Sequence, residues 1–448
     1  MTDTTIAYVH GRRVWDSRGR PTVEADVLLE GGAVGRAIAP AGASTGSGEA
    51  LDLRDGGSAF GGYDVTQAVG NVNTIIAHGV AGMDATDQEA VDERLIELDG
   101  TRGKSRLGAN ALLSVSMAVA HAAASAAGQP LYRYLGDADT VLIPLPQIQI
   151  FGGGAHAGRR VDIQDFMVLC PAADSFAQAL DWTAEIYRAA GRLMEEAGGL
   201  AGVADEGGWW PSFSSNEQAL DTLVKAIEHA GFRPGDQVGI GLDVAASQFG
   251  RNGRYKLALD DKELTSEGMI EMLTGWIDRY PILSIEDPLA EDDLAGFIAF
   301  SQAVGAKVQI VGDDFLVSDA DRLRDAAANG AGNAVLLKPN QRGTLTETLD
   351  TRRAAADCGY ATIASARSGE TEDVTVAHLA VGWGTGQLKV GSFTRGERMA
   401  KWNEMLRIEE ALGGKAHFAG RSVLGRSGLS QSGPGQSVPG PLGPSART

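Results

Sequence analysis

One repeating pattern restricts the fold of this chain more than any other feature. Between Gln237 and Gly391, short apolar runs of strand length each end in, or carry, a polar or charged group. Most of these runs are separated by stretches with helical apolar spacing, and the runs are VGIGLD, ILSIED, VQIVGDD, AVLLK, ATIASARS and GQLKVGS. This alternation is typical of a (β/α) barrel, in which function lies at the carboxyl ends of the strands.

The polar groups at these strand ends are suited to hold a divalent metal beside a base. Three of the runs end at or near Asp243, Glu286 and Asp313, and two later runs carry Lys338 and Lys389. Carboxylate oxygens are ligands that hard divalent cations prefer. A single acidic residue after a strand often only caps the next helix. Here a charged residue follows several successive strands, and this recurrence favours a catalytic site over helix capping.

Length and composition fit a globular protein of two or three domains. The chain has 448 residues, of which 43% are hydrophobic and 22% charged. Its net charge of −19 disfavours nonspecific binding to nucleic acid. No stretch approaches the roughly 18 uninterrupted apolar residues of a transmembrane helix, and the N-terminus lacks a signal-peptide core. Cys170 and Cys358 provide no disulfide framework, so we expect a cytoplasmic protein with no nucleic-acid or membrane partner.

The chain divides into three expected parts. Residues 1–137 are predicted to form an α+β domain, whose last helical stretch is rich in alanine and therefore expected to be buried. Residues 138–418 are predicted to form the barrel that carries the active site. Residues 419–448 are rich in glycine, serine and proline, so we expect a disordered tail. Within the first part, the glycine-rich loop 40–57 could close on a ligand.

The chain resembles the enolase family over nearly its whole length except the tail. The matching strings follow the family's order and are DSRGRPTVEADV, GASTG, LGANALLSVSMAVA, DEGG, SIEDP, VGDD, LLKPNQRGTLTET, RSGETED and KWNEMLRIEE. The resemblance implies an α/β fold, an enolase-like modified (β/α)8 TIM barrel that begins ββαα, with an N-terminal α+β capping domain. It also implies Mg²⁺ as cofactor, a phosphorylated three-carbon acid such as 2-phosphoglycerate or phosphoenolpyruvate as substrate, and a homodimer or homo-octamer.

The resemblance further implies which residues bind metal and which residue is the base. The family's metal ligands match Asp243, Glu286 and Asp313, and its loop serine, which meets a second metal, matches Ser44. Lys338 matches the base that removes the proton next to the substrate carboxylate. Carbon acids are weak, so the metal has to absorb the charge of the ene-diolate, and a lysine base needs cationic neighbours that lower its pKa.

Substrate contacts follow from the same resemblance. Lys389 matches the lysine that holds the substrate carboxylate, whereas Arg367 and Ser368 match the phosphate clamp. Gln164 is expected to bind substrate as well. The catalytic residues expected on the leaving-group side are His156, Glu206 and Asp165.

Two departures from the family pattern lie at catalytic positions. The family's QEFM is QDFM here, so Asp165 replaces a glutamate that helps handle the hydroxyl or water. One methylene shorter, its carboxylate should retreat by about an ångström, enough to disturb proton transfer. The family's SHRSGETED is SARSGETED, so Ala366 replaces a histidine beside the phosphate clamp.

Other departures add arginines or remove a hydroxyl. NGGSHAGN becomes GGGAHAGR, which loses a serine at Ala155 and gains Arg159. On the loop behind the predicted base, Arg342 stands where the family has isoleucine or valine. These arginines are either solvated loop charges or, taken together, binders of a larger or more anionic second group at the mouth of the site.

Three hypotheses follow. The first, which explains the departures best, is a diverged paralogue such as carboxyphosphonoenolpyruvate synthase, which transfers a phosphonoformyl group from a CMP-activated donor in phosphonate antibiotic biosynthesis. The second is an ordinary enolase, a phosphopyruvate hydratase that converts 2-phosphoglycerate to phosphoenolpyruvate and water in glycolysis. The third is a binding or scaffold role without metal-dependent turnover. A dead relic should lose the metal ligands and lysines first, and all of these remain.

Overall fold

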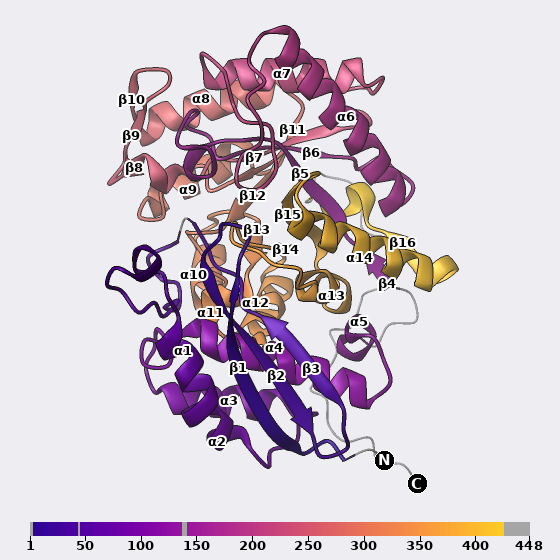
Figure 1. The fold of residues 1–448 in the computed structure, drawn as a ribbon. Helices are drawn as coiled ribbons and strands as arrows, with labels where there is room; N and C mark the ends of the chain where they lie inside the picture. The colour runs from indigo at the N-terminus through magenta and orange to yellow at the C-terminus, as the bar shows by residue number, and fades with distance from the viewer. Residues whose placement is uncertain (1–2, 44, 137–140, 425–448) are drawn as a thin grey trace.

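The computed structural model of the protein describes residues 3–43, 45–136 and 141–424. An N-terminal α+β part packs against a closed barrel whose strand order is β11-β12-β13-β14-β15-β5-β6-β7 (Figure 1). This is the predicted fold class, a TIM barrel with an α+β cap.

The N-terminal part is an antiparallel sheet with helices on one face. Its strands are β1 (Ile6–Trp15), β2 (Pro21–Leu29) and β3 (Val34–Ile38), paired in the order β1-β2-β3. Strand β2 forms because apolar side chains alternate along it and face the helices. The helical segments are η1 (Ala59–Gly62), α1 (Thr66–Asn71), η2 (Val72–Ile76), α2 (Ala77–Val80), α3 (Gln88–Asp99), α4 (Ala109–Ala126) and α5 (Leu131–Leu135).

Helix α4 is the buried helix that the alanine-rich sequence predicted. Its small residues let its backbone approach the sheet very closely at Gly35 of β3. A Cβ atom at Gly35 would lie 2.0 Å from the carbonyl oxygen of Ala118 and 2.2 Å from the amide nitrogen of Ala122. By length and composition α4 could cross a membrane, but 83% of it is buried inside the protein, so it is a core helix.

The barrel begins with two antiparallel strands and two helices, as the family resemblance implied. Strand β6 pairs antiparallel with both β5 and β7, and the other neighbouring pairs are parallel. The barrel strands are β5 (Leu145–Gly152), β6 (Asp165–Leu169), β7 (Gly239–Asp243), β11 (Ile282–Glu286), β12 (Gln309–Gly312), β13 (Ala334–Leu337), β14 (Ala361–Ser365) and β15 (Gly386–Ser392).

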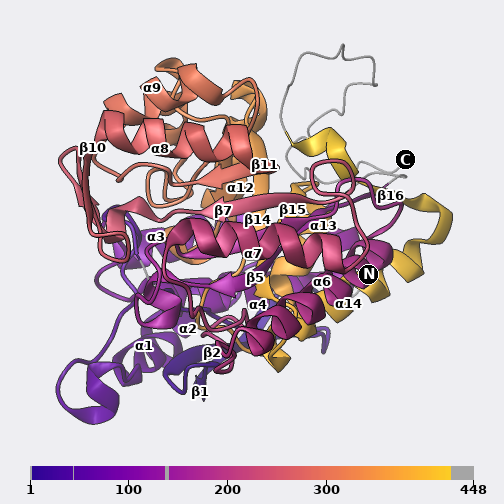
Figure 2. The same cartoon turned by 90° about the horizontal axis from the view of Figure 1, so that it is seen from above.

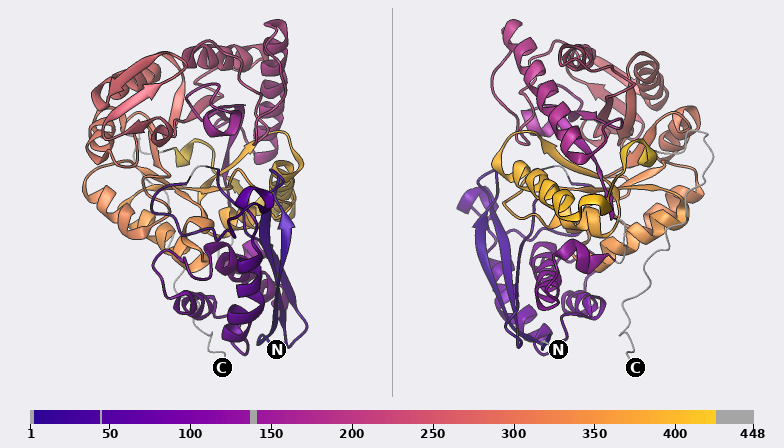
Figure 3. Two further views of the ribbon diagram at one scale, coloured as in Figure 1. Left: turned by 60° about the vertical axis from the view of Figure 1, so that its left-hand side comes forward. Right: turned by 90° about the vertical axis from the view of Figure 1, so that its right-hand side faces the viewer.

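Helices surround these strands (Figures 2 and 3). They bury one apolar face each against the barrel, and the fully buried Trp276 and Trp402 anchor two of them. The helices are α6 (Phe176–Glu196), α7 (Asn216–His229), α8 (Ser266–Arg279), α9 (Leu294–Val304), α10 (Ala320–Ala328), α11 (Pro339–Arg342), α12 (Leu345–Cys358), α13 (Thr375–Gly382) and α14 (Gly396–Leu412).

Short elements complete the fold. A small sheet consists of β8 (Gly250–Arg251), β9 (Arg254–Leu257) and β10 (Lys262–Thr265), and β4 (Val141–Ile143) pairs with β16 (Ala416–Phe418). Short helical turns are η3 (Gly154–Ala157), η4 (Ala246–Gln248), η5 (Gly413–Lys415) and η6 (Gly420–Val423). Because η6 contacts the barrel through a bond from Gln387 to Val423, the predicted tail from 419 begins too early. Residues 425–448 and the predicted boundary at 137/138 lie outside the described residues.

Polar contacts dock the N-terminal part onto the barrel. Thr346 of α12 donates its backbone N–H and hydroxyl to Asp92 of α3, at 2.9 and 2.7 Å. Lys104 contacts Glu347 at 2.8 Å. Asp92 is fully buried, and this burial raises the pKa of its carboxyl to about 6, while the donated hydrogen bonds oppose the shift. The contacts hold the loops of the N-terminal part over the carboxyl ends of the barrel strands.

The close approach of α4 to β3 predicts the effect of one added methyl group. Gly35→Ala should lower the free energy of unfolding by about 1–3 kcal/mol or more, because backbone rather than a flexible side chain meets the new Cβ. Gly70→Ala in α1 is the matched control, since a Cβ there meets nothing within 4 Å. Urea unfolding followed by circular dichroism compares the two. Equal stability of both variants would contradict this packing.

Candidate active site

The predicted charged residues meet at one end of the barrel. Asp243 and Glu286 are the last residues of β7 and β11, and Asp313 and Lys338 directly follow β12 and β13. Lys389 lies in β15. Because parallel strands end at the same edge, these five side chains converge, and all are buried.

Each lysine is paired with carboxylates. Lys389 Nζ lies 2.8 Å from Asp243 Oδ2 and 2.7 Å from Glu286 Oε2. Lys338 Nζ lies 2.5 Å from Asp313 Oδ2. Burial alone would lower the pKa of Lys338, but the Asp313 carboxylate raises it and the net shift is upward. The ammonium groups therefore balance much of the negative charge at the mouth of the barrel.

The carboxylates fit a hard divalent cation. Glu286 Oε1 is buried and has no hydrogen-bond partner among the described residues. Burial, and then the negative charge of Asp243, raise the pKa of Glu286 well above its usual value. A bound cation beside Glu286 would stabilise its ionised form. Oxygens of Asp287, Asp313 and Asp314 lie within 4.8 Å of one another. An all-oxygen donor set of this kind suits Mg²⁺.

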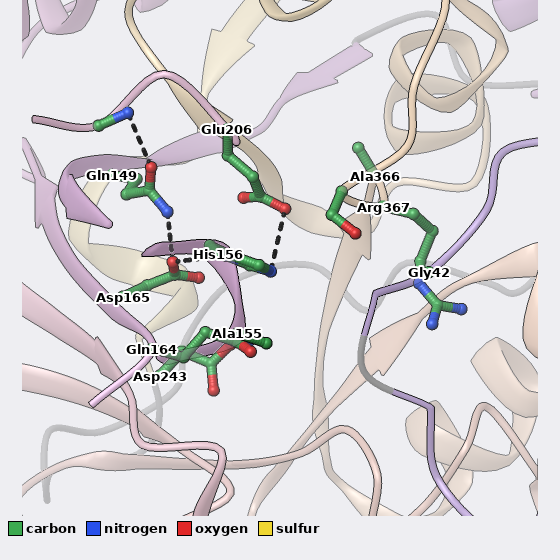
Figure 4. A network of polar contacts seen from close by, with 12 residues as sticks. Gly42, Gln149, Ala155, His156, Gln164, Asp165, Glu206, Asp243, Ala366 and Arg367 are labelled. Carbon is green, nitrogen blue, oxygen red and sulfur yellow. Dashed lines mark hydrogen bonds and ion pairs between the residues drawn. The ribbon is translucent and has the colours of Figure 1, made fainter. Parts of the chain in front are cut away.

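A histidine between two carboxylates forms the opposite side of the site (Figure 4). His156 Nδ1 lies 3.4 Å from Asp165 Oδ1, and its Nε2 lies 3.6 Å from Glu206 Oε1. Burial would lower the pKa of His156, but the charges of Glu206 and Asp165 outweigh it and raise the pKa. A histidine between two carboxylates is suited to give or take a proton.

Arg367 is the cation of the third side. Its guanidinium contacts both carboxylate oxygens of Glu49, at 3.1 and 3.2 Å, and the Asn340 side-chain oxygen at 2.9 Å. Ser368 accepts a hydrogen bond of 3.2 Å from Arg18 of the β1–β2 loop. A buried arginine fork beside a hydroxyl is suited to bind phosphate.

These groups enclose one cavity of about 20 Å³. It is small because the lysine side chains extend across it to the carboxylates. The cavity brings together four residues expected to contact substrate and three expected on the leaving-group side. It is lined among others by Lys338, Lys389, Arg367, Ser368, Gln164, His156, Asp165, Glu206, Asp243 and Ala366.

Arg342 and Arg159 do not line the cavity. The guanidinium of Arg342 contacts Asp319 at 2.5 Å and Glu347 at 3.4 Å, so its charge is already paired. Arg159 is exposed on the turn after η3, outside the cavity lining, with a positive φ of 57°. Of the two alternatives for these arginines, their positions favour charges of the surrounding loops over binders of a second anionic group at the mouth. Ser44 lies outside the described residues.

Sequence reasoning missed two residues of the site, Glu49 and Gln149. Glu49, the partner of Arg367, carries no local signal, because the pairing joins a loop to a distant strand end. Gln149 of β5 donates to Asp165 and is 1% exposed. Its signal was the alternation of glutamine with apolar residues in PLPQIQIFG, which places two polar side chains on one face of a buried strand.

The comparisons with known proteins agree with this geometry. Residues 6–135 match the family model described as enolase, N-terminal domain, and residues 140–427 match that of enolase, C-terminal TIM barrel domain. The chain is 48% identical to Enolase 1 of Desulfitobacterium hafniense (strain Y51) over 426 aligned residues. The aligned region covers 94% of this chain and 98% of that protein. The chain belongs to the enolase family.

The unpartnered Glu286 oxygen predicts stabilisation by Mg²⁺. At a concentration of 100 times Kd, a ligand that binds only the folded state stabilises it by about 2.7 kcal/mol, so the melting temperature should rise with Mg²⁺. Glu286→Gln should reduce this rise strongly. The matched control Glu185→Gln, at an exposed surface pair, should keep it. A thermal shift equal in all three proteins would contradict the site.

Proposed function

We propose that the protein is a Mg²⁺-dependent lyase that interconverts 2-phosphoglycerate and phosphoenolpyruvate plus water. The observation that carries the proposal is the convergence of Asp243, Glu286, Asp313, Lys338 and Lys389 at the barrel mouth. The 48% identity to a protein named Enolase 1, across both domains, supports this hydratase over the diverged paralogue that the sequence departures favoured.

In this proposal the barrel residues remove a proton from the substrate. Lys338 abstracts the proton next to the carboxylate, which Lys389 holds. Asp243, Glu286 and Asp313 would hold Mg²⁺, which would supply positive charge beside that carboxylate. The ion would also neutralise the negative charge of Asp313, which raises the pKa of Lys338. Burial and the nearby guanidinium of Arg367 then both lower this pKa towards that of a usable base.

The other two sides bind phosphate and handle the leaving hydroxyl. Arg367 and Ser368 bind the phosphate. His156, whose two ring nitrogens face carboxylates, gives a proton to the hydroxyl that leaves, with Glu206 as its partner. Asp165 stays ionised, because the Lys389 charge and the contact with His156 lower its pKa against the effect of burial.

A second candidate function is transfer of a phosphonoformyl group from a CMP-activated donor. The observation that favours it is the leaving-group side, where Ala366 provides no proton donor and Asp165 is ionised. The ion pairs of Arg342 speak against it, since that arginine is not free to bind an added anion.

We also propose a cytoplasmic location and assembly into at least a dimer. Both cysteines are free, which suits a reducing compartment. The β1–β3 sheet exposes large apolar side chains, namely Tyr8, Trp15, Leu28 and Val34, and its outer side lies at the edge of the molecule (Figure 3).

Absorbance of the enol product tests the proposed reaction. Protein with Mg²⁺ and 2-phosphoglycerate should form phosphoenolpyruvate, and EDTA should stop this. Lys338→Ala should abolish turnover, a loss of about 10⁴-fold or more, with the fold intact, because no other base is in place. The control Lys307→Ala removes an exposed lysine paired with Asp278 and should be as active as the natural protein.

Two outcomes would overturn the proposal. Turnover that survives Lys338→Ala would show that Lys338 is not the base. Formation of product only when a CMP-activated phosphonoformate is added, with no phosphoenolpyruvate from 2-phosphoglycerate alone, would replace the hydratase with the transferase.

A further inference from the structure

Gln149 links Asp165, one of the two carboxylates that flank His156, to the turn that carries the other, Glu206. Its side-chain Nε2 donates to Asp165 Oδ1, and its Oε1 accepts a hydrogen bond of 2.9 Å from the backbone N–H of Gly208 (Figure 4). Gly208 lies two residues after Glu206 in the same turn. One buried amide therefore contacts Asp165 directly and holds the turn that carries Glu206.

The turn is shaped to receive this amide. A Cβ atom on Gly208 would lie 2.4 Å from Gln149 Oε1, and one on Gly152 would lie 3.2 Å from it. Only glycine at position 208 lets the backbone N–H come so close. The backbone of β5 is held by Ser392, which donates to the Gln149 carbonyl at 2.6 Å. The segment after Gly208 is also joined to β5, because Trp209 donates to the Ile150 carbonyl at 2.8 Å.

The Gly208 bond also fixes which way the amide points. Since Oε1 accepts from a backbone N–H, Nε2 must face Asp165, and Asp165 Oδ1 must act as an acceptor. Asp165 is the shortened carboxylate of the site. Gln149 extends from the neighbouring strand β5 to the Asp165 carboxylate. We infer that the longer amide side chain of Gln149 compensates for the shorter carboxylate side chain of Asp165.

We propose that Gln149 is a positioning residue that sets the separation of Asp165 and Glu206 around His156, and so the geometry of proton transfer to the leaving group. This rests on the proposed hydratase function. Gln149 does not line the cavity. It acts through Asp165 and through the turn of Glu206.

Kinetics of Gln149→Asn test the role. The shorter amide cannot reach both partners, so kcat should fall about 10- to 100-fold, while KM for 2-phosphoglycerate stays within about twofold because phosphate and carboxylate contacts are unchanged. The double variant Gln149→Asn with Asp165→Glu moves one methylene from one side chain to the other. Its kcat should exceed that of Gln149→Asn by about tenfold or more, which a general loss of packing would not allow.

Gln147→Asn is the matched control. Gln147 lies on the same strand and is equally buried, but its amide donates to Gln387 at 2.9 Å, away from the site. It should leave kcat within about twofold. A fall in kcat equal to that of Gln149→Asn, or no recovery in the double variant, would overturn the proposal.

Hydrogen exchange tests the contact without turnover. In Gln149→Asn the amide of Gly208 loses its acceptor, so peptides covering residues 202–210 should exchange faster, and in Gln147→Asn they should not. Unchanged exchange in Gln149→Asn would refute the positioning role. If the natural protein fails to convert 2-phosphoglycerate, the proposed function falls, and this exchange result still decides whether Gln149 holds the turn.

Discussion

Negative charge buried at the mouth of the barrel is the constraint on which the rest of the site depends. Asp243, Glu286, Asp165 and Asp313 are each almost fully buried within one small region. A buried carboxylate without a partner costs several kcal/mol, so this region requires cations. Lys389 lies within 3.3 Å of three of these groups, and Lys338 contacts the fourth. The lysines to which we assign the chemistry are therefore also the groups that offset the cost of burying the carboxylates.

The N-terminal part has a role in the site because it supplies groups that the barrel lacks. Glu49 contacts Arg367, and Arg18 contacts Ser368, so loops of the cap lie against the side of the cavity that Arg367 and Ser368 form. These loops are held by the sheet and α4, whose backbones touch at Gly35, and by the bonds from Thr346 to Asp92. Packing far from the cavity thus determines how one of its sides is closed.

The sequence predicted the strand ends well, because each apolar run stops where its charged residue begins and parallel strands share an edge. Asp243, Glu286 and Lys338 could be placed together on that ground alone. The antiparallel pairing of β5 and β6 came only from the family resemblance, since apolar runs do not show strand direction. For Arg342 the sequence leaves a loop charge and an anion binder equally open, because nothing local reveals its partner Asp319. Long-range pairs of polar side chains are what local patterns leave out.

The contacts of Asp165 show how the site accommodates one departure from the family pattern. Asp165 is shorter than the family's glutamate, but it is held by Gln149, by His156 and by Lys389 rather than left alone. Asp165 is therefore part of a polar network around His156.

Exchange of the proton at C2 of 2-phosphoglycerate, followed by proton NMR in D₂O with Mg²⁺, tests the central claim most directly. It reports abstraction by Lys338 whether or not the hydroxyl then leaves. The account predicts loss of the C2 proton signal together with formation of phosphoenolpyruvate. A C2 signal that persists, with no phosphoenolpyruvate, would contradict the claim that this barrel mouth removes a proton next to the substrate carboxylate.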